Sequence, residues 1–351
     1  MRLKLREFEV IRKTAENIFF VARSHFLKKS IAEKRSTFLF LSDIMILYIK
    51  LYDLYNEKES GDSMQMDFKY GKHIDLIYHT LAHFHVDNAS DLYLPAYIDW
   101  MKQIRNCDLT IPVQMENYYN DNFDRLSGIN FLPFYSTDWD NLNQLLLNHH
   151  DFTEMDKKIF IVPFIQLLHN ESAMYFEFWE NQYQKIFDQK IHTENLLRNK
   201  FDIFQCLFDY SNKNAVAYLS FSLTRNGRGF SSVNGDFGAF APFPQSAKDI
   251  KNVFFTLLHE YSHQITDPLL NTSIHMGDDS HAISENIVIL FDYYLISTIC
   301  EADIESYFNW LAHIAGIADK KISVDEFLHI FCVSDNVHNE IKNLIDRITR
   351  K

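Results

Sequence analysis

One stretch of this chain constrains its fold more than any other, the segment 246–267 with the sequence SAKDIKNVFFTLLHEYSHQITD. Its apolar residues recur every three to four positions, which is typical of an amphipathic helix. Ser246, followed three residues later by Asp249, predicts a capping box at the N-terminus of this helix. Pro268 predicts its end, because proline cannot continue the backbone hydrogen bonding. We therefore predict a helix over residues 246–266.

This predicted helix contains the pattern H-E-x-x-H, formed by His259, Glu260 and His263. Residues at positions i and i+4 of a helix lie about 5–6 Å apart at Cβ, so the two imidazoles share one face. Two histidines placed in this way can bind one Zn²⁺, and the glutamate between them can act as the general base of a hydrolase. Zn²⁺ is the cofactor that the pattern predicts.

A catalytic zinc ion takes three protein ligands and leaves one position for water. Glu285 lies in the next predicted helix, 281–300, and we expect it to be the third ligand after His259 and His263. Other residues of the intervening loop and the start of the next helix remain open as alternatives, although their positions are less suitable. They are His275, Asp278, Asp279 and His281.

Asp292 follows Glu285 by seven residues and therefore lies on the same face of its helix. Its carboxylate could orient a metal-binding histidine, as the outer partners of metal ligands commonly do. A buried ionic pair that has no part in metal binding explains the position equally well.

The segment from about residue 246 to 299 resembles the gluzincin clan of zinc metallopeptidases, in which H-E-x-x-H is followed by a glutamate on a later helix. Its continuation, His-Gln-Ile-Thr-Asp-Pro-Leu, is similar to a bacterial family of uncharacterised peptidase-like proteins. The resemblance implies a zincin-like catalytic part, with His259, His263 and Glu285 as ligands and Glu260 as base. Thermolysin-like enzymes have an aspartate four residues after the glutamate ligand, and this chain has Ile289 there.

Gluzincins usually add a tyrosine or histidine that donates a hydrogen bond to the developing oxyanion. The resemblance therefore implies such a residue downstream of the helix 281–300 or within it. The sequence offers four candidates without choosing among them, Tyr293, Tyr294, His329 and His338.

For the whole chain we expect an α+β fold that is mostly α-helical. A mostly helical N-terminal region, residues 1–210, would precede the catalytic region, residues 211–351. We expect a strand at 64–68, and further helices at 32–55, 71–86, 92–104, 142–149, 157–170, 173–187, 194–210, 303–315, 324–332 and 336–348.

Residues 214–243 alternate β-branched, aromatic and small residues, and Asn226-Gly227 is a signal for a tight turn. We expect a small antiparallel hairpin sheet here, just before the H-E-x-x-H helix. Its edge could bind an extended peptide through main-chain hydrogen bonds. It could equally do no more than cover the core.

A second group of histidines lies at residues 79, 83 and 85. His79 and His83 also have the i, i+4 spacing, but the phase of the neighbouring apolar residues favours stacked histidines in a packed helix over a metal site.

The formal net charge of −13 argues against nucleic acid and anionic membranes as partners, since both require a basic surface. The four cysteines are widely spaced, which favours reduced thiols. We expect no signal peptide and no transmembrane helix, because apolar runs are interrupted by charges, and therefore a cytoplasmic protein. The sequence does not determine the oligomeric state.

These features together predict a zinc-dependent hydrolase, a metallopeptidase that cleaves peptide or amide bonds in a peptide or protein substrate. The alternative from another class is a catalytically silent metal-binding or interaction protein with the same fold. Glu260 favours the enzyme, because a purely structural metal site needs no base beside it.

Overall fold

The computed structural model describes residues 66–84, 93–104, 111–223, 227–231, 235–270, 280–314 and 323–350. The chain divides into two compact units, Met1–Ser63 and Met64–Lys351, and every described residue belongs to the second. The helix predicted at 32–55 lies outside the described residues. The predicted division between residues 210 and 211 falls inside the second unit, and it stays a prediction.

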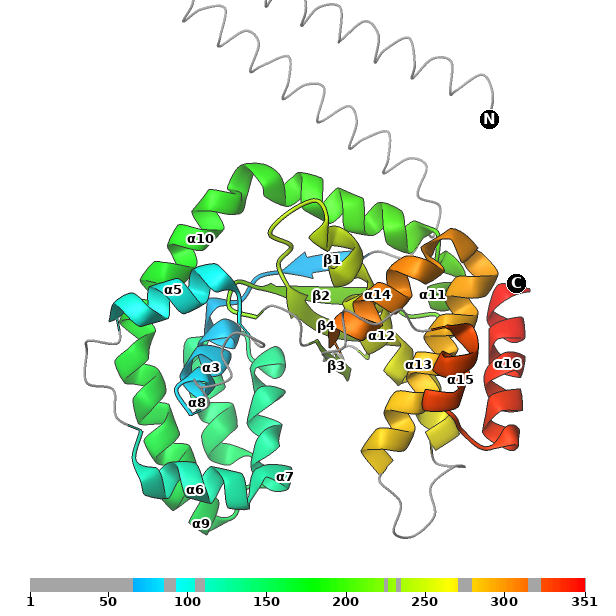
Figure 1. Cartoon of the computed structure of the whole chain (residues 1–351). Helices are drawn as coiled ribbons and strands as arrows, with labels where there is room; N and C mark the ends of the chain where they lie inside the picture. Colours follow the sequence, from blue (N-terminus) through cyan, green and yellow to red (C-terminus); the bar gives the residue numbers. More distant parts are fainter. Residues whose placement is uncertain are drawn as a thin grey trace, which may run out of the picture. The chain divides into compact units, whose positions relative to one another are not determined.

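The described part is mostly helical, as expected, and its helices surround one small sheet (Figure 1). The α-helices are α3 (Lys72–Ala82), α5 (Pro95–Ile104), α6 (Val113–Asp121), α7 (Phe123–Leu126), α8 (Trp139–Asn148), α9 (Glu154–Asp156), α10 (Val162–Asp202), α11 (Gln205–Ser211), α12 (Asp249–Leu270), α13 (Ser280–Ile299), α14 (Ile304–Ile314), α15 (Val324–Ile330) and α16 (Asp335–Thr349). Shorter 3₁₀ turns cover Ser127–Asn130, Leu132–Tyr135 and Glu301–Asp303, and a π-helical segment covers Lys157–Ile161.

The sheet has four strands in the order β1 (Met66–Lys69), β2 (Ala215–Ser220), β4 (Phe237–Pro242) and β3 (Arg228–Ser231). The first three are parallel, and β3 pairs antiparallel with β4 at the edge. The sheet is therefore mixed, and the prediction of a purely antiparallel hairpin sheet was wrong. Only the β3–β4 pair has that arrangement.

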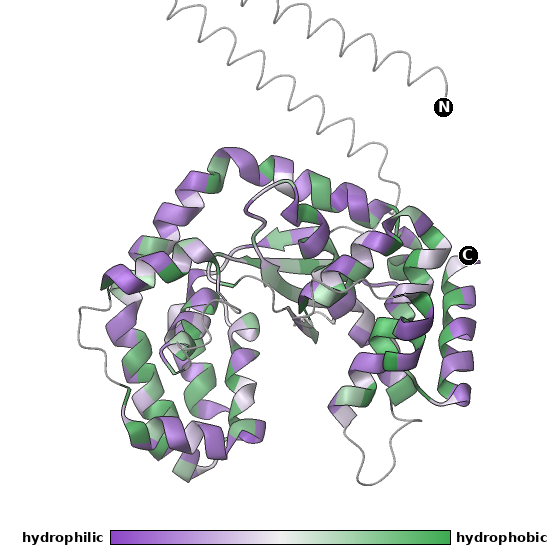
Figure 2. Cartoon of the chain, viewed as in Figure 1, coloured by the Kyte–Doolittle hydropathy of each residue, from purple (hydrophilic) through white to green (hydrophobic). Residues whose placement is uncertain are grey.

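Burial explains this strand order. Nearly every residue of β2 and β4 is buried, whereas β3 is short and half exposed. Strands that are buried on both faces belong in the middle of a sheet, and a short exposed strand belongs at its edge. Figure 2 shows hydrophobic residues along the sheet and mixed residues along most helices.

One long helix, α10, covers most of the three helices predicted at 157–170, 173–187 and 194–210, and the last of them is divided between α10 and α11. Its 41 residues contain no glycine, and its one proline, Pro163, lies in the first turn, where proline is tolerated. Nothing in its sequence therefore breaks the helix between residues 171 and 193. Residues 162–202 of these apolar stripes therefore form one helix, which contacts α3 along its first half and α12 further on.

The helix α12 carries the H-E-x-x-H pattern, and it begins three residues later than predicted, at Asp249. Ser246 donates a hydrogen bond to the Asp249 carboxylate at 2.9 Å, so the two predicted capping residues do interact. The prediction that Pro268 ends the helix was wrong, because α12 continues to Leu270. A proline this close to the end removes one backbone hydrogen bond, and Leu269 and Leu270 pack against the core.

α12 lies between the sheet and the C-terminal helices. It contacts β3 and β4 on one side and α10, α13 and α14 on others, and twelve of its residues are buried. α13 packs against α12, α14 and α16. By length and composition α13 is the one described helix that could span a membrane, but these contacts give its apolar residues protein partners. The expected absence of a membrane span stays a prediction.

Phe254 anchors α12 to the end of α10. Its side chain is fully buried, with its ring centroid 4.8 Å from that of Phe201 and 5.3 Å from that of Phe204. We expect Phe254→Ala to lower the free energy of unfolding by about 3–5 kcal/mol, because the side chain leaves a cavity that its neighbours cannot fill. Chemical denaturation followed by circular dichroism measures the change.

The control is Ile203→Ala, which lies beside the same aromatic cluster in sequence but is 47% exposed. This variant should change stability by no more than about 0.5 kcal/mol. Equal effects of the two substitutions would mean that Phe254 does not anchor α12.

Candidate metal centre

His259 and His263 project from the same face of α12, one turn apart, as their spacing predicts. Their ring centroids lie 4.8 Å apart, and the ring planes are nearly perpendicular at 83°. His259 is buried and His263 is partly exposed. This arrangement leaves Nε2 of both rings directed at the neighbouring helix, α13.

Glu285 of α13 meets both histidines. Its Oε2 lies 3.3 Å from His259 Nε2, and its Oε1 lies 3.4 Å from His263 Nε2. Zn–N and Zn–O bonds of about 2.0–2.1 Å in a tetrahedral site place neighbouring ligand atoms about 3.3–3.4 Å apart. The three residues predicted as ligands therefore come together at a spacing that fits a zinc ion.

The alternative ligands divide into two groups. His275, Asp278 and Asp279 lie outside the described residues. His281 begins α13, and its Nδ1 lies 3.8 Å from Glu285 Oε1, but its side chain is 85% exposed and it is not part of the converging group. Among the described candidates, Glu285 has the better position.

Asp292 contacts the nitrogen of the His259 ring that does not face Glu285. Its Oδ2 accepts a hydrogen bond from His259 Nδ1 at 2.9 Å, and its side chain is buried. The hydrogen bond fixes the ring so that Nε2 faces Glu285, which is how outer carboxylates orient metal-binding histidines. In this chain the carboxylate that contacts His259 lies seven residues after Glu285. The fourth position after Glu285 is occupied by Ile289.

These contacts set the charge of the metal-free group. Burial opposes protonation of His259, but its hydrogen bonds with Asp292 and Glu285 outweigh that effect and raise its pKa to about 10. Burial also acts on Glu285, where the two histidines prevail and hold the pKa of the carboxyl well below its usual range. A metal ion would have to displace the proton on His259, because the ligand is the neutral ring.

Glu260 lies beside the three ligand residues without belonging to them. Burial raises the pKa of its carboxyl, and the charges of His259 and His263 act in the opposite direction. The backbone of β3 approaches this side chain so closely that a Cβ at Gly227 would collide with Glu260 Oε1. A Cβ at Gly229 would lie 2.8 Å from the Glu260 carbonyl oxygen. The backbone contact therefore favours glycine at position 229, whereas a larger residue at position 227 would require the Glu260 side chain to move.

An open cleft with a volume of about 790 Å³ contains these groups. One wall is Gly227 with the strand β3 that follows it, and another is α12 with His259, Glu260 and His263. Trp310 of α14 lies on a third side, with its ring centroid 5.6 Å from that of His259. The cleft thus contains both an edge strand and the candidate metal-binding group.

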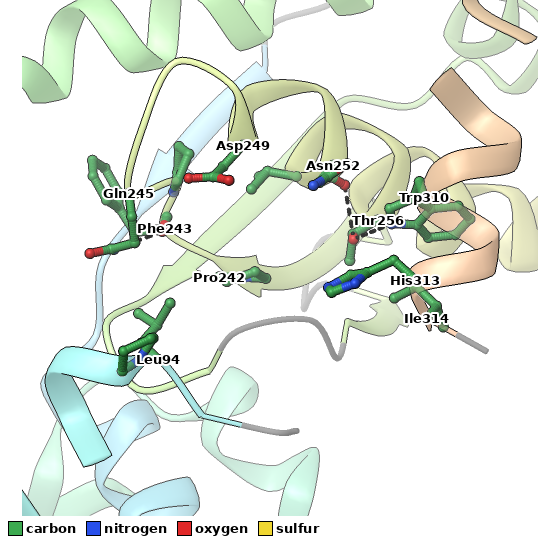
Figure 3. Close-up of a pocket in the computed structure, with 13 residues that line it drawn as sticks. Leu94, Pro242, Phe243, Gln245, Asp249, Asn252, Thr256, Trp310, His313 and Ile314 are labelled. Atoms are coloured by element: carbon green, nitrogen blue, oxygen red, sulfur yellow. Dashed lines mark hydrogen bonds between the residues drawn. The ribbon is translucent and has the colours of Figure 1, made fainter. Parts of the chain in front are cut away.

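A smaller pocket of about 270 Å³ lies near the N-terminal half of α12 (Figure 3). Trp310 and Thr256 line both cavities, and Trp310 Nε1 donates a hydrogen bond to Thr256 Oγ1 at 3.1 Å. The lining is mainly apolar and includes Pro242 and Phe243. None of the predicted ligands lines this pocket, and all three line the larger cleft.

None of the four residues proposed for oxyanion stabilisation lines the cleft. Tyr294 shares a 2.6 Å hydrogen bond with His338, and Tyr293 stacks on Phe308. His329 is exposed on α15. Among the residues that line the cleft, Arg228 carries a positive charge that acts on Glu260 and opposes the rise in the pKa of its carboxyl that burial causes.

The sequence interpretation did not predict that Arg228, Trp310 and the two glycines Gly227 and Gly229 line the cleft. Asn226-Gly227-Arg228-Gly229 carries a signal, because two glycines around one residue often mark a close backbone approach. No local pattern connects Trp310 with the H-E-x-x-H helix, since about fifty residues separate them.

Comparison of the chain with models of protein families, with curated proteins and with solved structures finds no match. The resemblance to gluzincins therefore rests on His259, Glu260, His263 and Glu285 alone.

The hydrogen bond from Asp292 gives a test of the centre. Asp292→Asn keeps the volume of the side chain but removes the charge that orients His259. We expect the affinity for Zn²⁺ to fall about 10–100-fold, which is the usual effect of losing an outer partner of a metal ligand. Competition with a chromogenic chelator measures this affinity.

Asp188→Asn is the matched control, because Asp188 is exposed on α10 and does not line the cleft. Its affinity for Zn²⁺ should equal that of the parent protein. If Asp292→Asn also kept that affinity, His259 would not be a ligand oriented in this way.

Proposed function

We propose that this protein is a zinc-dependent hydrolase, a metallopeptidase that cleaves peptide or amide bonds. The observation that carries the proposal is the position of Glu260. Two histidines and a glutamate converge at the spacing of zinc ligands, and Glu260 lies next to them in the cleft without joining them. A zinc site that only stabilises a fold has no use for this fourth group.

In this proposal His259, His263 and Glu285 hold the ion. When bound, zinc supplies a Lewis acid and makes water nucleophilic at neutral pH. Glu260 accepts a proton from the attacking water and returns it to the leaving amine, which is general base and then general acid catalysis. Asp292 keeps His259 in the required orientation. Arg228 offers guanidinium donors for the negative charge that develops on the substrate.

The edge strand β3 supports a peptide as substrate. β3 pairs with β4 on one side, and its residues from Arg228 to Ser231 line the cleft. An extended peptide can add to such an edge through main-chain hydrogen bonds, which hold the backbone independently of its sequence. This geometry would bring a substrate backbone alongside Glu260. The zincin-like character of the fold is part of the same proposal.

The net charge of −13 supports a partner other than nucleic acid or an anionic membrane surface. We propose a cytoplasmic protein whose partner is its peptide or protein substrate.

The test removes the base and keeps the metal. A proteome-derived peptide library is incubated with the parent protein and with Glu260→Gln, after metal analysis has confirmed zinc in both. We expect turnover in the variant to fall by about 10²–10⁴-fold, because Gln accepts no proton. Mass spectrometry of the products measures cleavage, and Glu340→Gln, an exposed change on α16, should retain full activity.

Two outcomes would contradict the proposal. Equal cleavage by the parent protein and Glu260→Gln would reject Glu260 as the base. Cleavage by neither protein, despite bound zinc, would favour the alternative, a catalytically silent metal-binding or interaction protein.

The close approach of β3 gives a second test. In Gly227→Ala the new Cβ would meet Glu260 Oε1 and would lie 2.7 Å from Thr256 Cγ2. Glu260 must therefore move, and a catalytic group displaced by about 1 Å can cost about 10²-fold in rate. We expect kcat to fall by about that factor while the zinc content stays at the parent level.

Gly128→Ala is the control, since a Cβ at Gly128 meets no atom within 4 Å. Its kcat should equal that of the parent protein. Full activity of Gly227→Ala would mean that the position of Glu260 does not depend on β3.

A further inference from the structure

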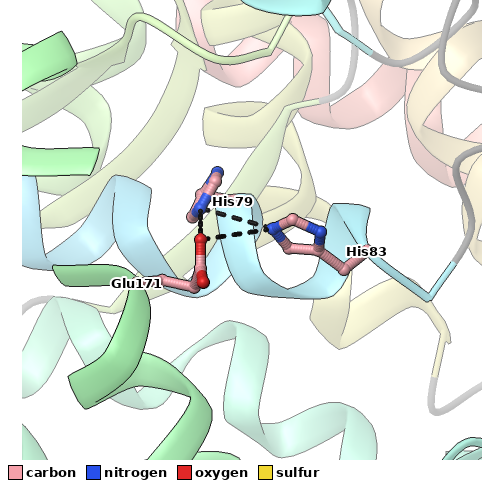
Figure 4. A group of neighbouring side chains, drawn as sticks. All are labelled: His79, His83 and Glu171. Carbon is pink, nitrogen blue, oxygen red and sulfur yellow. Dashed lines mark hydrogen bonds and ion pairs between the residues drawn. The ribbon is translucent and has the colours of Figure 1, made fainter. Parts of the chain in front are cut away.

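A second group of metal-binding side chains lies away from the cleft, at the contact of α3 with α10. His79 and His83 project from one face of α3, and Glu171 of α10 meets them (Figure 4). The sequence interpretation favoured stacked histidines without a metal here, and it did not anticipate Glu171. His85, the third histidine of that interpretation, lies outside the described residues.

The three atoms that face one another form a nearly regular triangle. Nε2 of His79 lies 3.1 Å from Glu171 Oε2, Nε2 of His83 lies 3.6 Å from the same oxygen, and the two nitrogens are 3.4 Å apart. A point equidistant from three atoms at these separations is about 2.0 Å from each, which is the length of a Zn–N or Zn–O bond. The pocket between the side chains therefore has the size of a zinc ion.

The chemistry of the three atoms also suits a metal ion. In the metal-free group both Nε2–H can donate to Glu171 Oε2, and an ion would take the place of these protons. A metal ion accepts a lone pair from all three at once. The side chains of His79, His83 and Glu171 are only 0%, 8% and 4% exposed, so water cannot readily satisfy them instead.

Neighbouring residues hold His79 in the orientation that a ligand needs. Its Nδ1 shares a 2.8 Å hydrogen bond with the Tyr97 hydroxyl, which leaves Nε2 free to face Glu171. Its ring stacks on that of Tyr175, with centroids 4.4 Å apart and planes at 19°. Asp292 and His259 have the corresponding relationship in the first centre, so both pairs include an outer partner for one imidazole.

We propose that His79, His83 and Glu171 form a second zinc site, with three protein ligands and without a base beside the ion. The residue after His79 is Thr80, where the first centre has Glu260, and its hydroxyl donates a hydrogen bond to the Leu76 carbonyl. The site thus lacks a base at the position that makes the first centre suited to hydrolysis. Its ion joins α3 to α10, and through Tyr97 it also fixes α5.

Metal analysis of the full-length protein tests the proposal separately from the proposed function. Protein prepared without chelator should contain about two zinc ions per chain, if each centre holds one. His263→Ala should lose one of them, Glu171→Gln should lose the other, and the double variant should contain none. His192→Ala is the control, because His192 is exposed on α10, belongs to no group of metal-binding residues in the described part of the chain and should not change the zinc content.

A second measurement covers the case in which a variant does not fold. Co²⁺ is titrated into metal-free His263→Ala protein, where the site of α3 and α10 is the remaining centre. We expect the visible absorption of bound Co²⁺ to saturate at one equivalent. The same absorption should be lost when His83→Gln or Glu171→Gln is added to this background, with circular dichroism reporting the helical content.

The outcomes are distinguishable. Zinc lost only from His263→Ala would support the first centre and reject the second. Zinc lost only from Glu171→Gln would support the second centre and remove the basis of the proposed function. Absence of Co²⁺ absorption in His263→Ala protein, or unchanged absorption in folded His83→Gln and Glu171→Gln variants, would overturn the proposal of a second site.

Discussion

The contact between α12 and α13 holds the candidate active centre together. Asp292 is the residue on which this contact most depends. This carboxylate is buried in a helix that is apolar on nearly every side, and an unpaired charge in such a place is strongly destabilising. His259 is the partner that compensates it. The same contact brings Glu285 to both histidines. Packing of the two helices and assembly of the ligand group are therefore one event, since neither helix satisfies its polar groups alone.

A second constraint comes from the sheet. β3 approaches α12 so closely at Gly227 and Gly229 that a Cβ at either position would collide with Glu260. This approach is what places an edge strand and a carboxylate in the same cleft. It depends on the strand order, because β4 and β2 occupy the middle of the sheet and leave β3 at the edge. The arrangement of the candidate site therefore depends on the mixed topology of the sheet.

The pairs His79–His83 and His259–His263 share one local geometry, but they differ in the residue that follows the first histidine. Each pair lies one turn apart on a helix, and each meets a glutamate from a helix packed against it. The residue that follows the first histidine is Glu260 in one pair and Thr80 in the other. Spacing on the helix supplies a place for an ion, whereas this neighbouring residue decides whether a base is available beside it.

The sequence by itself determined the features that depend only on the spacing of residues within one helix or strand. The helical period identified α12 and α13, and the i, i+4 rule placed His259 and His263 on one face. Local signals failed where a distant partner decides the outcome. Apolar stripes could not show that α10 is one helix, and alternation could not show which strands are neighbours in the sheet. Glu171 lies 88 residues beyond His83 in the numbering and has no pattern of its own. Only the tertiary structure brought it to α3, because long-range packing, not local propensity, decides which helices meet.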